Sequence, residues 1–520
     1  MNPELEVASQ PLPVGHTGVH YEIFVRSFAD SNGDGIGDLN GVTNNLDYLK
    51  ELGVSAIWLM PISPSPTYHK YDVTDYYGID PEYGTLDDAR RLVGAAHQRG
   101  IAVIIDLVLH HTSVQHPWFR ESVKGPNSPY RNYYRWLHPD EIRARKLATR
   151  AITADSGERN PWHAAPGEAH LKSAEKYYGM FWSGMPDLNF DHRPVREEVF
   201  KVARYWINEV GVDGFRLDAA RHLYQEAEEP KNHEFWEEFS REVRAKTCNS
   251  HDAEACEVFT VGEVWTRPER IAPYFRGLKA NFNFDLRLLI EEVVRREDDT
   301  EDLIEFLAYT HGAFTNINPQ FIDALILSNH DQNRIGSLLK GNVNQLKVAA
   351  NILLTLPGLP YLYYGEEIGM LGLKPDENLR EPFLWDIRAR DKQRTSWRRG
   401  RYSTSQTVRP LAEQQADPNS LFNHYKRLIY YRNNHPVLND NLSRLGQTGI
   451  RQQGTVSFIR QTAHGARVLV VHNLTRKPTD VVLSPDEARC QTIAFATVEG
   501  AAFANDRLTL PPYSCAVLEG

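Results

Sequence analysis

Three acidic residues stand at the ends of short apolar segments that read as β-strands. Asp218 ends DGFRLD, Glu263 follows FTVG, and Asp331 follows DALILSNH. Carboxyl groups that lie together can divide covalent attack and proton transfer, provided that one is ionised and another keeps its proton. Each residue also has a purely structural interpretation, since Asp218 alone could cap a helix.

Four more polar residues end or follow two of these segments or a fourth one, AVIID (102–106). They are Asp106, His111, Arg216 and His330. Taken singly, His111 could be a loop histidine and Arg216 a structural ion-pair partner. A cation at Arg216 would hold Asp218 ionised, and the charges of Asp218 and Asp331 would raise the pKa of Glu263. Core packing does not explain so many polar side chains at strand ends, so we expect a reactive site.

The elements that must position these residues alternate between strand and helix over the first four-fifths of the chain. The expected strands are 19–28, 55–60, 102–106, 213–218, 259–264, 280–285, 323–330 and 361–367. Expected helices include 40–52, 86–99 and 196–210. This alternation predicts an α/β fold with a parallel sheet, closed at this length into a (β/α)₈ TIM barrel. The chemistry of such barrels lies at the carboxyl ends of the strands.

Two segments depart from the alternation. Residues 112–185 are rich in Trp, Tyr, His and Pro, and they are too many for a plain loop, so we expect an inserted domain B. After about residue 440, runs such as RVLVVHNL predict a C-terminal antiparallel β domain. The expected division is a catalytic barrel at 1–111 and 186–438, domain B at 112–185, and domain C at 439–520.

The bulk composition excludes several classes of protein. The chain has 520 residues and a net charge of −10, which disfavours binding to nucleic acid or to an anionic membrane. No apolar run approaches the ~20 residues of a membrane-spanning helix. The N-terminus lacks the features of a signal peptide, so we expect a cytoplasmic protein, or a periplasmic or secreted one whose signal was removed. Cys248 with Cys256 and Cys490 with Cys515 allow two disulfides or four free thiols.

Four segments resemble the signature regions of glycoside hydrolase family 13, the α-amylase family. They are DLVLHH (106–111), GFRLDAARH (214–222), GEVW (262–265) and LSNHD (327–331). MPDLN (185–189) is similar to the motif of the intermediary group between oligo-1,6-glucosidases and neopullulanases. The resemblance runs in order over nearly the whole chain. It implies a (β/α)₈ barrel with an inserted domain B and a C-terminal β-sandwich.

The resemblance implies roles in retaining hydrolysis by double displacement. Asp218 would be the nucleophile, Glu263 the general acid/base, and Asp331 the third carboxylate, which holds the 2- and 3-hydroxyls of the sugar. Such a mechanism places the first two carboxyls ~5–5.5 Å apart. The residues expected to bind substrate are Tyr71 (an aromatic platform under the sugar), Asp106, His111, Arg216, Arg221, His222, His330 and Arg334.

The segment DSNGDGIGD (30–38) has the spacing of a metal-binding loop. Its alternating oxygen ligands would be Asp30, Asn32, Asp34, the carbonyl of Ile36, and Asp38. Similar loops in oligo-1,6-glucosidase-like members of the family bind Ca²⁺, so the resemblance implies a structural Ca²⁺, with Mg²⁺ as the alternative. A metal-free turn stays open, because Gly41 stands where an EF-hand has its closing Glu. A second calcium site of many amylases uses an Asn where this chain has His110, a poor Ca²⁺ ligand, so we do not expect that site.

Substrate choice rests on residues around these motifs. Tyr68 replaces the capping Asp of the family's α-glucosidases, which favours a site open to longer chains, and Lys70 replaces a usual Gly. Ala219 is common in α-1,4-acting members. The expected function is hydrolysis of α-1,4 bonds in starch, maltodextrins or maltooligosaccharides. The alternatives are an α-glucosidase, a 4-α-glucanotransferase, and, more remotely, a non-catalytic glucan-binding relative. We expect a monomer, because we see no N-terminal domain of the kind that builds dimers in the neopullulanase group.

Overall fold

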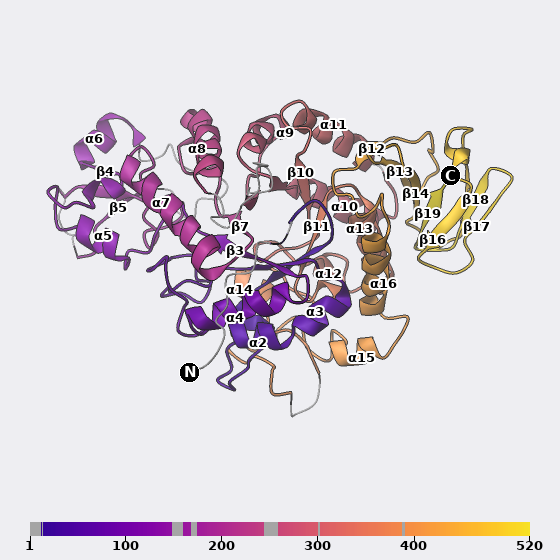
Figure 1. Ribbon diagram of the computed structural model, residues 1–520, viewed down its shortest axis with the longest axis horizontal. Helices are drawn as coiled ribbons and strands as arrows, with labels where there is room; N and C mark the ends of the chain where they lie inside the picture. The colour runs from indigo at the N-terminus through magenta and orange to yellow at the C-terminus, as the bar shows by residue number, and fades with distance from the viewer. Residues whose placement is uncertain are drawn as a thin grey trace.

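The centre of the molecule is a closed barrel of parallel strands (Figure 1). The computed structural model describes residues 12, 14–147, 160–167, 174–243, 258–299, 302–386 and 391–520. Around the barrel the strands are β1 (His20–Ile23), β2 (Ala56–Leu59), β3 (Ala102–Leu107), β7 (Gly214–Leu217), β8 (Phe259–Gly262), β9 (Ala280–Phe282), β10 (Ile322–Leu325) and β11 (Leu359–Tyr363). The predicted (β/α)₈ fold is confirmed.

The barrel interior is filled by side chains from alternate strand positions. Trp58, Phe282 and Tyr361 meet there, with ring centroids 5.5 Å apart for the first two and 5.0 Å for the last two. The other strand positions, such as Ile57, face the surrounding helices and are equally buried. The strands are apolar on both faces for this reason, and the catalytic side chains have to stand at their ends.

Helices cover the outside of the barrel. The longer ones are α4 (Leu86–His97), α7 (Arg193–Tyr205), α8 (Glu229–Glu242), α10 (Phe284–Arg296), α11 (Leu303–Thr315), α13 (Val343–Thr355) and α16 (Leu421–Asn434). The side chain of Thr85 caps α4 by accepting from the backbone of Asp88. Gly53 ends the helix before β2 with a φ of +94°, a conformation that glycine adopts at little cost.

Several predicted elements are shorter than the sequence indicated: the strands expected at 280–285, 323–330 and 361–367 end at Phe282, Leu325 and Tyr363. Two others are also interrupted by a different local structure. The expected strand at 19–28 ends at Ile23, and Val25–Phe28 forms a helical turn, α1. The expected helix at 40–52 is two helices, α2 (Leu39–Asn44) and α3 (Leu46–Leu52). Asn45 separates them, and its side-chain amide donates to the carbonyl of Gly41 at 2.8 Å, a local bond that competes with the helical pattern.

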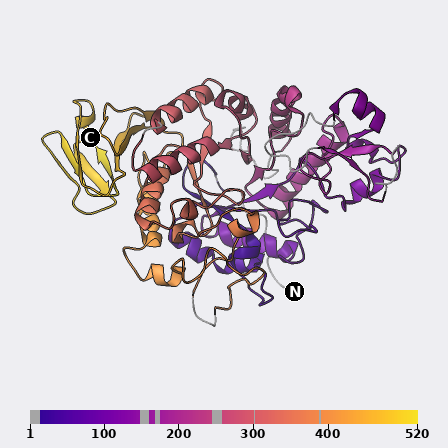
Figure 2. The same ribbon diagram turned by 180° about the vertical axis from the view of Figure 1, so that it is seen from behind.

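Smaller β-structures lie at opposite ends of the molecule (Figures 1 and 2). Between β3 and β7 the chain forms a sheet of β4 (Trp136–Leu137), β6 (Lys176–Tyr178) and β5 (Trp162–Ala164). The C-terminal region forms two antiparallel sheets: β12 (Arg444–Gly446), β13 (Thr455–Gln461), β14 (Arg467–Asn473), β19 (Ser514–Glu519) and β16 (Thr492–Ala496) in the first, and β15 (Thr479–Val482), β18 (Arg507–Leu510) and β17 (Ala502–Ala504) in the second. The boundaries 112–185 and 439–520 stay predictions.

The structure describes two of the four cysteines. Cys490 and Cys515 are both buried free thiols, so the disulfide hypothesis is wrong for this pair. Cys248 and Cys256 lie outside the described residues. In the part of the chain that the structure describes, no helix has both the length and the apolar character needed to cross a bilayer.

Candidate active site

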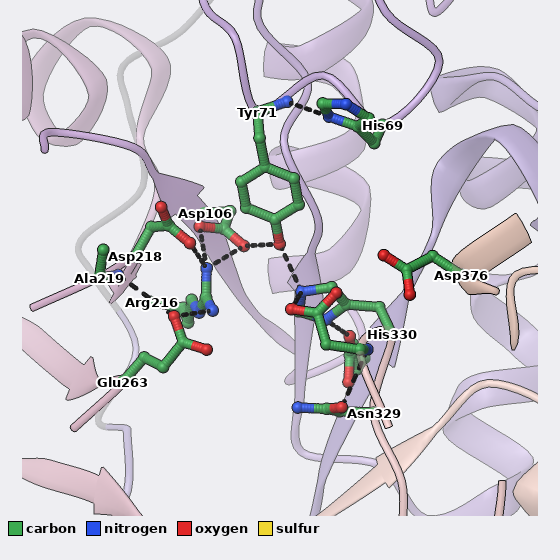
Figure 3. A network of polar contacts seen from close by, with 12 residues as sticks. His69, Tyr71, Asp106, Arg216, Asp218, Ala219, Glu263, Asn329, His330 and Asp376 are labelled. Atoms are coloured by element: carbon green, nitrogen blue, oxygen red, sulfur yellow. Dashed lines mark hydrogen bonds and ion pairs between the residues drawn. The ribbon is translucent and has the colours of Figure 1, made fainter. Parts of the chain in front are cut away.

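The carboxyl ends of the barrel strands bring the predicted residues together (Figure 3). A cavity of about 830 Å³ opens there. Predicted residues that line it are Tyr71, His111, Asp218, Arg221, His222, Glu263 and Asp331. Asp106, Arg216 and His330 lie directly behind this lining and contact it through hydrogen bonds. The barrel thus positions side chains from five different strands or the loops after them at one place.

Arg216 contacts three carboxyl groups at the centre of the site. Its guanidinium is buried and donates to Asp218 at 2.6 Å and to Asp106 at 2.9 Å through the same nitrogen, Nη1. Its other terminal nitrogen, Nη2, lies 2.7 Å from Oε2 of Glu263. One planar cation therefore fixes the relative positions of both predicted reactive carboxyls. The ~5 Å separation of these carboxyls stays a prediction.

The surroundings of Glu263 raise its pKa and so favour its protonated form. Burial raises its pKa, and the negative charges of Asp218 and Asp331 raise it further, against the opposing charge of Arg216. The backbone N–H of Ala219 donates to Glu263 at 3.2 Å. Ala219 has a φ of +48°, which is rare for a residue with a Cβ and costs energy that the surrounding structure must offset. The arrangement suits a general acid.

The surroundings of Asp331 shift its pKa in the opposite direction. Although burial opposes it, the charges of His330 and Arg380 hold the pKa of Asp331 well below its usual range. Nδ1 of His330 lies 2.6 Å from Glu22, and its Nε2 lies 3.1 Å from Asp331. These two carboxylates raise the pKa of His330 to about 10, against the effect of burial. Asp331 is therefore an acceptor of hydrogen bonds, and His330 is a cation.

The ring of Tyr71 is held from several sides (Figure 3). It stacks on His330 with a centroid distance of 5.6 Å and an interplanar angle of 18°. Its hydroxyl donates to Asp106 at 3.1 Å and lies 2.6 Å from Nε2 of His330. Its backbone carbonyl accepts from Nε2 of His111 at 3.2 Å. Burial lowers the pKa of His111 to about 4, so this histidine is neutral.

Two departures from the family pattern have clear positions. Lys70 is buried with a φ of +64°, where a glycine would be unstrained. Its Nζ lies 2.8 Å from Asp80 and 2.7 Å from Glu82, behind Tyr71 and away from the cavity lining. Tyr68 stacks on Trp397 at 5.4 Å and does not line the cavity. His69, between them, does line it.

One predicted substrate-binding residue neither lines the cavity nor donates from its side chain to a residue that does. Arg334 is buried and is not among the residues that line the cavity. Its guanidinium donates to the carbonyls of Leu379 and Tyr364, each at 2.8 Å. It therefore supports the loop beneath the site instead of facing a ligand. Arg221 keeps its predicted place, since it lines the cavity and donates to the carbonyl of Trp265 at 2.6 Å.

Sequence reasoning missed several residues of the cavity wall. They include His69, Trp182, Trp265, Lys374, Asp376 and Arg380. Arg380 donates to Asp331 at 2.7 Å and therefore contacts one of the three predicted carboxylates directly. The stretch KPDENLREPFLW (374–385) contains three of them. Its sequence gave no sign that the loop folds back over the strand ends.

The predicted metal loop is only partly assembled. Asp30, Asn32 and Asp34 line one hollow of about 420 Å³, together with Lys392 and Arg394. Asp38 instead caps α2, accepting from the backbone of Gly41 at 2.7 Å, and neither it nor Ile36 lines the hollow. Within the described ranges, no group of three or more His, Cys, Asp or Glu side chains is placed to hold a metal ion. The oxygen donors fit Ca²⁺ in type, but their present bonds are those of a hydrogen-bonded turn.

His110 also has a defined environment. Its Nε2 lies 3.3 Å from Asp187, and its Nδ1 lies 3.0 Å from Nδ1 of His111. His110 therefore supports a residue that contacts the Tyr71 platform.

Comparison with known proteins decides the family. A family model described as the catalytic domain of α-amylase matches residues 22–441. The chain belongs to the α-amylase family. Residues 456–517 of this glycoside hydrolase match a model described as the C-terminal domain of the α-amylase SusG.

Relatives cover the glycoside hydrolase almost from end to end. "Alpha-amylase 3" of Dictyoglomus thermophilum is 41% identical over 96% of this chain and 93% of its own length. A 4-alpha-glucanotransferase of Thermotoga neapolitana is 32% identical over 88% of this chain and 96% of its own. The crystal structure of an alpha-amylase from H. orenii superposes with a TM-score of 0.84 at 40% identity, covering 97% of this chain and 99% of that one.

Proposed function

We propose that this protein cleaves α-1,4-glucosidic bonds in starch, maltodextrins or maltooligosaccharides, with retention at the anomeric carbon. The observation that supports this most strongly is the bridging of Asp218 and Glu263 by Arg216 at the floor of an open cavity. Retaining hydrolysis needs one ionised and one protonated carboxyl side by side, and two observations support this: both carboxyls contact Arg216, and the pKa of Glu263 is raised.

In the first step, one oxygen of Asp218 attacks the anomeric carbon. The bond to the leaving oxygen breaks, and Glu263 donates its proton to that oxygen. Arg216 holds Asp218 in position through the 2.6 Å contact, while the raised pKa of Glu263 keeps the proton available. In the second step Glu263, now ionised, takes a proton from water, and the resulting hydroxide displaces Asp218 from the sugar.

Residues on the other side of the sugar hold it during these steps. Asp331, an ionised acceptor, would take hydrogen bonds from two neighbouring ring hydroxyls, and His330, a cation, would hold Asp331 and Tyr71 in place for this contact. Tyr71 would pack its ring against the sugar face. The charges of these groups are set before the substrate arrives, so little reorganisation is needed in the transition state.

The cavity favours internal bonds of a chain over terminal ones. An enzyme that removes single glucose units needs a wall beyond the sugar on Tyr71. Tyr68, which stands at the usual capping position, stacks on Trp397 and does not line the cavity. The product profile from maltoheptaose tests this proposal. We expect mixed maltooligosaccharides from the start, and glucose as the sole initial product would contradict it.

Glycosyl transfer is the second candidate. The 4-alpha-glucanotransferase relative supports it, and so do Trp182 and Trp265, which are 41% and 42% exposed on the cavity wall where an acceptor sugar could stack. Water and sugar compete for the same covalent intermediate. Adding maltose to the maltoheptaose reaction separates the two functions, because only transfer gives products longer than the substrate.

We propose that the loop 30–38 binds a structural Ca²⁺, with Mg²⁺ as the alternative. Asp30, Asn32 and Asp34 supply hard oxygen donors on one hollow, which is the ligand type that these cations prefer. The site is remote from Glu263 in the sequence and would stabilise the first loop of the barrel. A calcium-dependent rise in the melting temperature would support this.

A further inference from the structure

Glu22 is a buried carboxylate that reaches the active site through one neighbour. It stands on β1, two positions after His20, whose ring packs against Phe259 and Tyr361 inside the barrel. Since alternate residues of a strand share a face, Glu22 also points inward. Its exposed fraction is 1%, and its Oε1 lies 2.6 Å from Nδ1 of His330. A buried negative charge needs a partner of opposite charge, and His330 supplies it.

The other ring nitrogen of His330 contacts two groups of the site. Nε2 lies 3.1 Å from Asp331 and 2.6 Å from the hydroxyl of Tyr71. That hydroxyl donates its single proton to Asp106, at 3.1 Å (Figure 3). Asp106 is an acceptor here, because both of its oxygens also take hydrogen bonds from Arg216. The proton between Tyr71 and His330 is therefore on Nε2.

Both nitrogens of His330 must then carry a proton. Tyr71 and Asp331 need the donor at Nε2, and the carboxylate of Glu22 needs a donor at Nδ1. A neutral ring has only one N–H and would turn a lone pair toward one of the two carboxylates. The pKa of His330, raised to about 10, agrees with this pattern of hydrogen bonds. The charge of His330 thus depends on Glu22 as well as on Asp331.

We propose that Glu22 is a positioning residue for the reaction and acts through His330. Its negative charge keeps the second proton on the ring, so that Nε2–H holds Asp331 and the Tyr71 hydroxyl in the arrangement that the sugar meets. The inference rests on the proposed function and adds to it a residue that touches no substrate, since Glu22 does not line the cavity. Removing only the charge should slow the reaction where His330 becomes neutral.

Other titratable groups near Glu22 and His330 have to be the same in the proteins compared. Asp106 titrates in the working range, because burial and the charge of Asp218 raise its pKa to about 7. The others keep one charge state: His20, whose pKa burial lowers to about 3, Tyr71, Tyr361 and Tyr363, whose pKa values burial raises, and the cations Arg216 and Arg380. Variants of Glu22 in one background leave all of these groups in place.

The test measures the first chemical step without its general acid. In Glu263→Gln, α-maltosyl fluoride can still form the covalent intermediate, because fluoride needs no proton to leave. The rate of the fluoride burst is measured against pH in Glu263→Gln alone, and with Glu22→Gln or Glu22→Asp added. Glu22→Gln keeps the shape and an acceptor oxygen but removes the charge. Glu22→Asp keeps the charge on a side chain shorter by one methylene.

We expect no alkaline fall in the burst rate of Glu263→Gln until pH approaches the pKa of His330, about 10. Adding Glu22→Gln removes one of the two negative charges that raise this pKa, so the fall should begin at lower pH. It should reach roughly 10- to 100-fold, as for the loss of one charge-assisted hydrogen bond, and stay within about threefold at acidic pH, where His330 keeps its proton. Glu22→Asp should restore most of the alkaline rate. An equal loss at every pH, no loss, or no recovery in Glu22→Asp would overturn the proposal.

A second measurement does not depend on turnover. NMR of isotope-labelled histidines follows the protonation of His330, whose signal is identified by its loss in His330→Asn. The ring should stay an imidazolium to higher pH in the wild type than in Glu22→Gln, and equal titration in the two proteins would overturn the proposal. Failure of the wild type to cleave maltoheptaose would instead refute the proposed function, and the titration would still report on Glu22.

Discussion

Replacing the nucleophile should separate activity from stability in this protein. We predict that Asp218→Asn loses turnover by on the order of 10⁵-fold or more, since an amide cannot form the covalent intermediate. That loss corresponds to about 7 kcal/mol of transition-state stabilisation. The fold should be unaffected.

The charges around Arg216 explain why stability should survive. With Glu263 protonated, the buried cation faces two carboxylates, Asp106 and Asp218. Burial and the charge of Asp218 both raise the pKa of Asp106, because the negative charges of the two carboxylates repel each other. Asparagine at 218 removes one negative charge, leaves a balanced pair, and can still accept the bond from Arg216. The change in unfolding free energy should stay within about 1 kcal/mol, or about 2 °C in Tm.

The assays are turnover of maltoheptaose and thermal unfolding of the same preparation. Asp213→Asn is a matched control, because Asp213 is also buried but accepts from the backbone of Val103 at 2.6 Å, far from the cavity lining. It should lower Tm and leave the kinetics of the folded fraction unchanged. Turnover above about 1% of wild type in Asp218→Asn, or a fall in Tm as large as that of the control, would refute the reasoning.

Three further predictions concern Glu263, Arg334 and the loop 30–38. Wild-type turnover of maltoheptaose should fall as pH rises through the raised pKa of Glu263, because the general acid must be protonated. Glu263→Gln should lose at least about 10²–10⁴-fold in rate and should no longer show this fall at high pH. A pH profile unchanged from that of the wild type would contradict the assignment. Arg334→Met should lower stability by about 3 kcal/mol in denaturant unfolding, because two buried carbonyls lose their donor, whereas a selective rise in KM would restore its predicted contact with substrate. Ca²⁺ added after chelation should raise Tm, and Asp30→Asn should remove that rise; equal responses of wild type and variant would place the ion elsewhere.

Sequence periodicity was sufficient for the barrel because barrel strands are apolar on both faces. Short apolar runs therefore mark them, and the polar residues that end them mark the carboxyl edge. Local breaks were harder to predict. Asn45 divides one expected helix through a side-chain bond, and the strand that begins at His20 ends after four residues, although the strand was expected to run to Phe28. These outcomes depend on tertiary packing, which periodicity does not report.

The centre of the site was predictable and its wall was not. Asp218 and Glu263 follow strands directly, so strand order alone brings them together. Arg380 and His69 reach the cavity through loops whose paths depend on distant partners. Arg334 shows the reverse error, since a position close behind Asp331 in sequence points its side chain into the supporting loop.

The most direct test of the mechanism is to capture the covalent intermediate. In Glu263→Gln, attack on α-glucosyl fluoride needs no proton for its leaving group, but the second step lacks its base. The glycosyl-enzyme should accumulate, and mass spectrometry of its peptides should find one added hexose on Asp218. A hexose on another carboxylate, or none although fluoride is released in one burst, would contradict the account.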